Sequence, residues 1–276
     1  MIPEAVFVRD GMGFAATELA LGPWAPGALH GGAPAALLAR EFVDFAQGAP
    51  LRPARITYEF IRPVMLGPLS ARIEVVRPGR RVTLLDGFLR DGDGVEVTRA
   101  RALLLAPAPL SAGELEPPPF LGPQDGEPTD WSFPTPMFAT HAMEIRLVEG
   151  ALRRPGPAVA WFRLRQPVIA GEAPAGIERI AAAGDFGNGI GSELSWEDHS
   201  FINADLTLSV QRDPVDEWVA LQSRMRVVQG SVAVAESVLW DREGRIGHAL
   251  QSLLVAREDR GADAGSGGPP ISGGRP

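Results

Sequence analysis

Two stretches of the chain repeat the same order of features at the same spacing, and this internal repeat limits the possible folds most strongly. Each contains an alternating run closed by a proline, Arg55–Ile61 before Pro63 and Asp205–Val210 before Pro214. Each continues through two more strand-like runs and a turn, with a Leu-Leu pair nine residues after the turn glycine. We therefore expect two copies of one structural unit.

The alternating runs and the turns predict antiparallel strands. Ile56, Tyr58 and Phe60 alternate with polar neighbours, as in a strand with one buried face. The turns Asp91–Gly94 and Asp241–Gly244 predict hairpins whose glycine adopts a positive φ. A calcium loop is the alternative at Asp91–Gly94, but the further ligands and the closing glutamate are missing.

A helix is expected ahead of each set of strands. In the first copy the helix is predicted over Ala35–Ala46, with an apolar face of Leu38, Phe42 and Phe45. In the second copy Ala175–Ala183 predicts a less regular helix that leads into a glycine-rich segment. Because helices this apolar need a cover, we expect an α+β fold in which a curved antiparallel sheet wraps each helix.

Composition divides the chain into four parts. The proline-dense stretch 107–136 predicts an extended connector that runs over the surface. Residues 257–276 are rich in Gly, Ser, Asp and Pro and predict a disordered tail. The two structural units are then expected at residues 1–106 and 137–256.

Charge and hydropathy exclude several classes of protein. The net charge of -8 argues against binding to nucleic acid, and no apolar run is long enough to span a membrane. Cysteine is absent, so disulfides and thiolate chemistry are excluded. No secretory pattern is seen at the N-terminus, and we therefore expect a cytoplasmic protein.

Several short motifs of the chain occur together in one known family. In the first half they are His30-Gly31-Gly32 before the alanine-rich helix, Phe60–Pro63, Leu66–Pro68 and Gly79–Arg81. In the second half they are Gly184–Phe186, Asn203–Asp205, Arg212–Pro214 with Glu217-Trp218, and His248–Gln251. In this order and spacing, the chain resembles the double hot-dog acyl-CoA thioesterases of the bacterial type II kind.

The resemblance implies a fold, an activity and an assembly. The fold would be a tandem double hot-dog, and the activity would be hydrolysis of an acyl-CoA or acyl-carrier thioester without any cofactor. By the same resemblance, two fused units would associate again as a homodimer.

The resemblance also implies a set of catalytic residues. Asp185 matches the aspartate of the family and Gln251 matches its glutamine, while Asn203 stands where a threonine is often found. An asparagine amide can donate and accept hydrogen bonds, although it does not have the shape of a hydroxyl. We expect Asp185 and Gln251 to lie about 4 to 6 Å apart and to share one bridging water.

Each of these residues also has a purely structural interpretation. Asp185 could cap a turn, since Asp before Gly is common there, and Gln251 could be a polar residue of an edge strand. Arg101, seven residues after Gly94 as Gln251 is after Gly244, is taken as the repeat-related counterpart of Gln251.

Two loops are candidates for binding the substrate. The loop of His30, Gly31 and Gly32 could contact the pantetheine or the acyl chain, because glycine allows a close backbone approach. His30 itself is more simply explained as a residue that satisfies backbone groups. The backbone N–H groups of Phe186, Gly187 and Asn188, at a possible helix start, could stabilise an oxyanion. No spacing of histidines predicts a metal site.

Two other functions remain open. A hot-dog enoyl-CoA hydratase would pair an aspartate with a histidine a few residues later, but Gly191 stands where that histidine would be expected. A non-catalytic acyl-binding or biosynthetic scaffold of the same fold is the second alternative.

Overall fold

The structure is a computed structural model that describes residues 2–108, 115–129, 135–152, 154–227 and 230–257. The first half contributes strands β1 Phe7–Asp10, β2 Gly13–Ala16, β3 Arg52–Phe60, β4 Pro68–Arg77, β5 Val82–Asp91 and β6 Glu96–Leu105. The second half contributes β7 Glu127–Pro128, β8 Met143–Glu149, β9 Ala158–Leu164, β10 His199–Asn203, β11 Asp205–Val210, β12 Val219–Val227, β13 Val232–Trp240 and β14 Arg245–Arg257. The α-helices are α1 Gly32–Phe45, α2 Gly176–Gly184 and α3 Gly187–Gly191.

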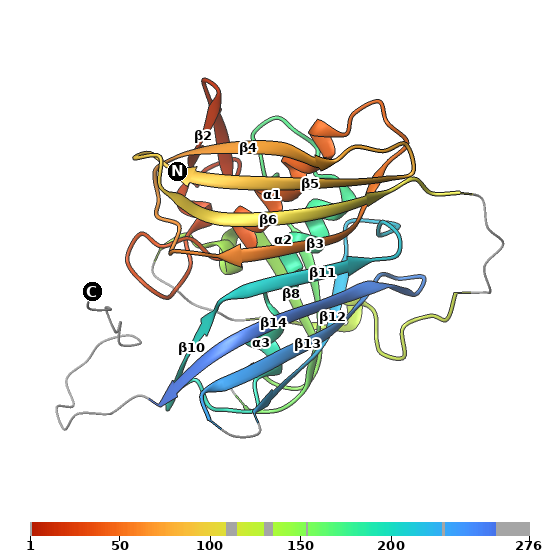
Figure 1. The fold of residues 1–276 in the computed structure, drawn as a ribbon. Coiled ribbons are helices and arrows are strands. Elements are labelled where there is room, and N and C mark those ends of the chain that lie inside the picture. Colours follow the sequence, from red (N-terminus) through yellow and green to blue (C-terminus); the bar gives the residue numbers. More distant parts are fainter. Residues whose placement is uncertain (1, 109–114, 130–134, 153, 228–229, 258–276) are drawn as a thin grey trace.

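All these strands belong to one sheet, in which the two halves meet edge to edge (Figure 1). The order along the sheet is β1-β2-β4-β5-β6-β3-β11-β14-β13-β12-β9-β8-β7, and β10 pairs with β14. At the junction of β3 and β11, Thr57 lies opposite Thr207 and their hydroxyl oxygens are 3.3 Å apart. An approximate twofold axis through this pair relates the two halves.

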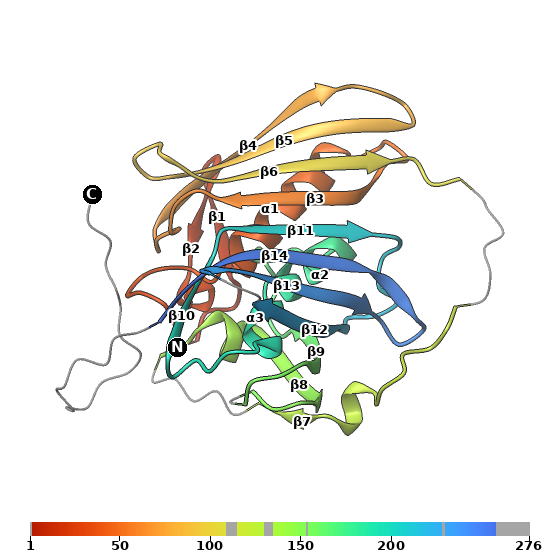
Figure 2. The same ribbon diagram turned by 60° about the horizontal axis from the view of Figure 1, so that its bottom comes forward.

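The helices lie on one side of the curved sheet (Figure 2). Helix α1 packs on β3, β4, β5 and β6, whereas α2 and α3 pack on strands of the second half, and α1 contacts α2 directly. One apolar core contains buried residues of both halves, such as Leu38 and Ile180. The α+β prediction of helices wrapped by curved antiparallel sheets is confirmed.

Helix α1 begins three residues earlier than expected. The Nδ1 atom of His30 accepts the Gly32 N–H at 3.1 Å, which satisfies one of the donors left free in the first turn of a helix. At the other end, Phe45 is 50% exposed and does not belong to the buried face formed by Leu38 and Phe42.

The second helix is broken in two. Asp185 and Phe186 stand between α2 and α3, and both keep helical backbone angles. The break explains why the sequence predicts a less regular helix here. It also places Asp185 at a helix end, where its carboxylate can turn toward the neighbouring loop.

The predicted hairpins are present, but their glycines differ. Gly94 has φ of 80°, as expected for the turn between β5 and β6. Gly244 is not among the described glycines with positive φ, so that part of the prediction is wrong. An added Cβ at Gly244 would lie 2.8 Å from the Glu116 carbonyl oxygen, so glycine serves close packing at this turn.

The described part of the connector packs on the outer face of the second half. The Phe120 ring contacts Trp161 and Trp240 edge-on, and the Leu121 carbonyl accepts the Trp161 indole N–H at 2.8 Å. Arg257 is the last residue of β14, so the tail cannot begin there, and the remainder of the expected tail lies outside the described residues. The boundaries of the two units stay a prediction.

None of the helices in the described parts of the chain combines the length and apolar character needed to cross a bilayer.

Candidate active site

Asp185 lies at the break between α2 and α3, against the strands of the second half. Its side chain is 7% exposed. The preceding Gly184 packs so closely on β11 that an added Cβ would lie 2.7 Å from a methyl group of Leu208. This contact fixes where α2 ends and therefore where the Asp185 carboxylate stands.

The three expected catalytic residues meet at this carboxylate. Asn203, the last residue of β10, donates from Nδ2 to Asp185 Oδ1 at 2.5 Å, and Gln251 on β14 donates from Nε2 to the same oxygen at 3.1 Å. The contact of Asp185 with Gln251 is direct, so the expected separation of 4 to 6 Å is wrong. Both amides therefore donate to Oδ1, and neither donates to Oδ2.

The amide of Gln251 is held on both sides. Its Nε2 also donates to the Asp185 carbonyl at 3.1 Å, and its Oε1 accepts the Asn188 N–H at 3.1 Å. The side chain is buried, with 2% of the residue exposed. Gln251 thus ties the end of α2 to the start of α3 and sets the orientation of Asp185.

The counterpart predicted for Gln251 is wrong. Arg101 faces the outside of the sheet, where it forms a bidentate ion pair with Asp86. The register around Thr57 and Thr207 instead makes Ala102 equivalent to Gln251, because Ala102 lies opposite Ile56 and is fully buried.

The first half also contributes to this site. His30 Nδ1 lies 3.1 Å from Asp185 Oδ2, and the imidazole stacks on the Phe186 ring with centroids 4.4 Å apart. A neutral imidazole nitrogen either donates or accepts. Nδ1 can therefore accept the Gly32 N–H or donate to Asp185, but a single proton position does not serve both contacts. The family resemblance predicted that this loop lies near the substrate. It did not predict the contact between His30 and Asp185, because that contact depends on how the two halves pack.

The two glycines after His30 are needed for close packing. An added Cβ at Gly31 would lie 2.7 Å from Asp185 Oδ2, and one at Gly32 would lie 2.7 Å from the Ala182 carbonyl oxygen. The groups that the backbone of this loop approaches closely are therefore Asp185 and helix α2.

The segment Phe186–Asn188 has little free surface. The Phe186 side chain is 1% exposed and packs against His30 and Phe162, so it lies in the core. The Phe186 N–H donates to Ala183, and the Asn188 N–H is used by Gln251. Of the three expected oxyanion donors, Gly187 at the first position of α3 is the one whose N–H is not engaged in these contacts.

Two buried acceptor atoms at the site have no hydrogen-bond partner within the described chain. They are the side-chain oxygens Oδ1 of Asn203 and of Asn188. The orientation of the Asn203 amide follows from chemistry, because only its NH₂ group can donate to the carboxylate of Asp185. Its Oδ1 therefore needs a donor, such as the hydrogen of a water molecule.

Sequence reasoning did not identify a pair of buried hydroxyl groups behind α3. Ser223 on β12 and Ser237 on β13 have oxygens 2.6 Å apart, and both residues are less than 4% exposed. An added Cβ at Gly187 would lie 2.7 Å from Ser237 Oγ and 2.8 Å from Gln251 Oε1. Serine in an alternating strand carries no recognisable pattern, so nothing in the sequence marks this pair.

Among the described residues, no three His, Asp or Glu side chains lie close enough to hold a metal ion.

Comparisons with known proteins show the family of the chain. Residues 20–105 match the family described as the acyl-CoA thioesterase N-terminal domain, and residues 114–255 match the acyl-CoA thioesterase C-terminal domain. No curated protein matches the chain in sequence.

Solved structures show the same fold. A proposed thioesterase from Novosphingobium aromaticivorans is 23% identical, with 90% of this chain and 98% of that one covered and a TM-score of 0.69. A hot-dog protein of unknown function from Alicyclobacillus acidocaldarius is 18% identical, with coverage of 93% and 97% and the same TM-score. The acyl-CoA thioesterase II TesB2 from Mycobacterium marinum is 13% identical, with coverage of 90% and 94% and a TM-score of 0.63. The predicted double hot-dog fold is confirmed.

Proposed function

The chain belongs to the acyl-CoA thioesterase family and is a thioester hydrolase, and from this premise we propose that Asp185, Asn203 and Gln251 carry out the hydrolysis of acyl-CoA. The observation that carries the proposal is the Asp185 carboxylate, held by both amides at one oxygen. Its other oxygen faces the His30 loop.

In the proposed reaction, a water molecule lies between Asp185 Oδ2 and the unpartnered Oδ1 of Asn203. Asp185 takes one proton as the water oxygen attacks the thioester carbonyl carbon. The negative charge that develops on the carbonyl oxygen is stabilised by the Gly187 N–H at the start of α3. When the carbon–sulfur bond breaks, the thiolate leaving group takes the proton back from Asp185, and no cofactor is required.

The roles of the two amides differ in this scheme. Asn203 donates to Asp185 and accepts from the water, so it takes both parts that a threonine hydroxyl would take. Gln251 uses its amide on protein groups, and we therefore assign it to positioning Asp185. His30 lies beside the same carboxylate from the first half, with Nδ1 3.1 Å from Asp185 Oδ2.

The hydratase alternative lacks the residue that it requires. An added Cβ at Gly191 would lie 2.8 Å from the backbone of Ser223, so this position has no room for a histidine side chain.

The proposal is tested by following the release of CoA with a thiol-reactive dye across a panel of acyl-CoA substrates. Asp185→Asn keeps the shape of the side chain and removes most of its basicity, so kcat should fall by about 10²-fold or more. Asp205→Asn is the matched control, because Asp205 begins the neighbouring strand and accepts the Ser252 N–H at 2.6 Å. Hydrolysis by Asp185→Asn at the wild-type rate would exclude the mechanism.

We also propose that the protein forms a homodimer, as the resemblance implies. An exposed apolar row on the outer face supports this, since Leu254 lies between Ile202 and Val232 and the three are 49–64% exposed. Light scattering at micromolar concentration should give twice the chain mass, and Leu254→Arg should reduce it. The expected cytoplasmic location stays a prediction.

A further inference from the structure

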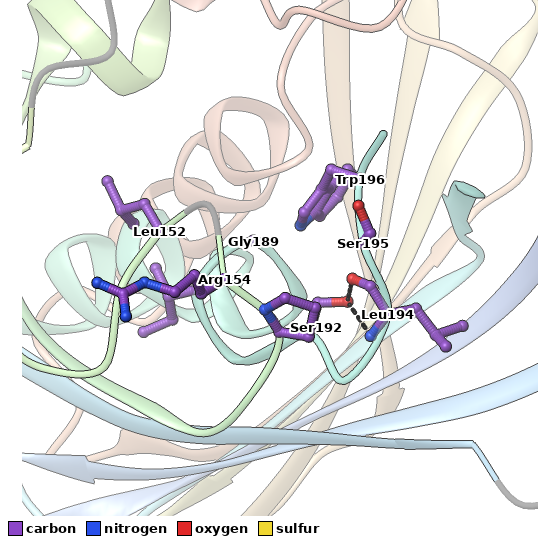
Figure 3. A pocket seen from close by; sticks show the side chains of 9 residues that line it. Leu152, Arg154, Gly189, Ser192, Leu194, Ser195 and Trp196 are labelled. Atoms are coloured by element: carbon purple, nitrogen blue, oxygen red, sulfur yellow. Dashed lines mark hydrogen bonds between the residues drawn. The ribbon is translucent and has the colours of Figure 1, made fainter. Parts of the chain in front are cut away.

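A cavity lies near the start of α2, at the other end of this helix from Asp185. It is lined by residues 164–167 and 172–174, by Arg179 on α2 and by Glu217. Its volume of about 270 Å³ approaches the range of about 300–1,000 Å³ that is typical of small-molecule sites. The hollow beside α3 (Figure 3), at about 10 Å³, takes only a single water-sized group. Of these two spaces, the cavity near α2 is therefore the one that can hold an organic ligand.

Three side chains of this cavity carry N–H donors that have no partner within the described parts of the chain. They are Arg165, which is exposed, and Gln166 and Arg179, which are partly exposed. A guanidinium stays charged at every pH that a cell reaches, and its N–H groups match the paired oxygens of a carboxylate or a phosphate. These donors favour an anionic ligand.

The two carboxylates that also line the cavity are already paired with arginines outside its lining. One oxygen of Glu172 lies 2.6 Å from Arg9, and the other lies 2.8 Å from Arg40. Glu217 pairs with Arg163 at 2.5 Å. The negative charges are thereby offset, whereas the positive charges of the two arginines in the lining are not. The cavity therefore attracts negative charge.

The rest of the lining is apolar and comes from Leu164, Pro167, Ala173 and Pro174. A ligand that fits this cavity therefore combines one anionic group with a small apolar body. Hydrolysis of a thioester releases a molecule of this kind, a free carboxylic acid, which is an anion at neutral pH. We propose that the cavity is a second site, separate from Asp185, that binds the free acid which the enzyme releases; the choice of ligand rests on the function proposed above.

The cavity and the Asp185 carboxylate are far enough apart to be occupied together. Arg179 precedes Asp185 by six residues, which is about 9 Å along the axis of α2. The carboxylate of Asp185 faces the His30 loop, and that loop does not line the cavity. Acid bound in the cavity thus leaves Asp185 free for a substrate.

The test is an NMR titration with hexanoate while S-hexyl-CoA, a thioether that water cannot cleave, occupies the site at Asp185. Hexanoate should shift backbone amide signals of residues 164–179. Arg165→Gln and Arg179→Gln should each raise its Kd about 5-fold, because an exposed ion pair contributes up to about that factor. Hexanamide, which has no charge, should bind equally weakly to wild type and to both variants. Arg154→Gln is the matched control, because Arg154 is exposed and lines the hollow beside α3 instead.

An unchanged Kd in both arginine variants, or no binding of hexanoate to the wild-type protein, would overturn the inference. Hexanoate that bound only without S-hexyl-CoA would overturn it too, since the acid would then occupy the site at Asp185. Inorganic phosphate that bound through the same arginines where hexanoate did not would exclude the acid as the ligand. The titration needs no turnover, so a failure of the proposed function, seen as no release of CoA, is distinguished from a failure of this site.

Discussion

The two halves share one backbone arrangement but differ in the side chains that face the helix. In β6 the inward row is Ala100, Ala102 and Leu104, and in β14 the equivalent row is Ala249, Gln251 and Leu253. A single change, alanine to glutamine, converts an apolar row into one that can hold a carboxylate.

The helices of the two halves also differ in whether apolar or polar groups lie between helix and sheet. In the first half the Phe42 ring packs so tightly on β5 that an added Cβ at Gly87 would lie 2.7 Å from it. At the equivalent strand position the second half has Ser237, which faces Gly187. Opposite this strand position the second half has Gly187 in place of an aromatic ring, and its helix is broken, so the amide of Gln251 and the hydroxyl of Ser237 pack against the helical segment there. One fold supports an apolar core in one copy and a polar site in the other.

The hairpin turns show a second difference, which predicts the largest effect. Asp91 accepts the Val95 N–H in its turn and is partly exposed. In contrast, Asp241 is fully buried, accepts three backbone N–H groups and pairs with Arg212. Asp241→Asn should lower the free energy of unfolding by about 3 kcal/mol, since Arg212 then loses its buried partner. Asp91→Asn should cost less than about 1 kcal/mol. Urea denaturation of both variants measures the difference, and equal losses would contradict it.

The Asp241 effect should depend on pH. Burial alone would raise the pKa of Asp241, but Arg212 and the backbone donors outweigh burial, and the pKa is lowered. A carboxyl group with a lowered pKa stabilises the fold above the ordinary value of about 3.9, and this contribution is lost as the pH falls through the lowered pKa. The stability gap between wild type and Asp241→Asn should therefore close below about pH 4.

The inward rows of β6 and β14 predict the second-largest effect, a loss of turnover. Gln251→Ala frees the Asp185 carboxylate from one of its two amide donors, so kcat should fall about 30-fold, less than for Asp185→Asn. The mirrored change, Ala102→Gln, buries an amide without partners and should lower stability while kcat is kept. Steady-state kinetics and thermal melts separate the two outcomes. A loss of turnover in Ala102→Gln alone would reverse the assignment of the active half.

Substitution of Gly187, which packs against the sheet, is expected to cause a smaller loss of turnover. Gly187→Ala places a methyl group against Ser237 Oγ and Gln251 Oε1, so Gln251 must shift and kcat should fall about 10-fold. Adding Ser237→Ala removes one of the two clashes and should restore part of the rate. Gly87→Ala meets the Phe42 ring at a similar distance, far from Asp185 in the sheet order, and should cost stability only. Absence of any rescue by Ser237→Ala would show that this hydroxyl does not limit the position of Gln251.

The sequence predicted the repeat, the helices and the three residues that meet at Asp185. It misassigned the counterpart of Gln251 because residues were counted from the turn glycines. Counting assumes that both halves have the same register, and it pairs Leu104 with Leu254. However, Leu104 faces inward, whereas Leu254 is 49% exposed and its neighbour Leu253 faces inward. The pairing of β5 with β6 leaves five residues, 91–95, between Arg90 and Glu96, whereas the pairing of β13 with β14 leaves four, 241–244, between Trp240 and Arg245. This difference of one residue shifts the count from the turn glycine, and no local pattern reveals it.

The contact of His30 with Asp185 could not be derived in the same way. It joins residues of different halves and depends on how α1 and α2 pack. The sequence marks the loop, through its two glycines, but not the side chain that it will meet.

The smallest effect is expected at Arg101, and it tests the register directly. Arg101 lies one residue before Ala102 and points outward to Asp86, with N–O distances of 2.6 and 2.8 Å. Arg101→Ala should leave kcat within about twofold of wild type, because an outward side chain of the first half cannot reach Asp185. The hydrogen bond from Arg101 lowers the pKa of Asp86, so the variant should show that pKa raised toward its ordinary value in an NMR titration. A shifted Asp86 titration with unchanged turnover would establish that the substitution acted where the register places it. If Arg101→Ala instead lowered kcat as much as Gln251→Ala, counting from the turn glycines would be the better guide to equivalence, and the assignment of Ala102 would fall.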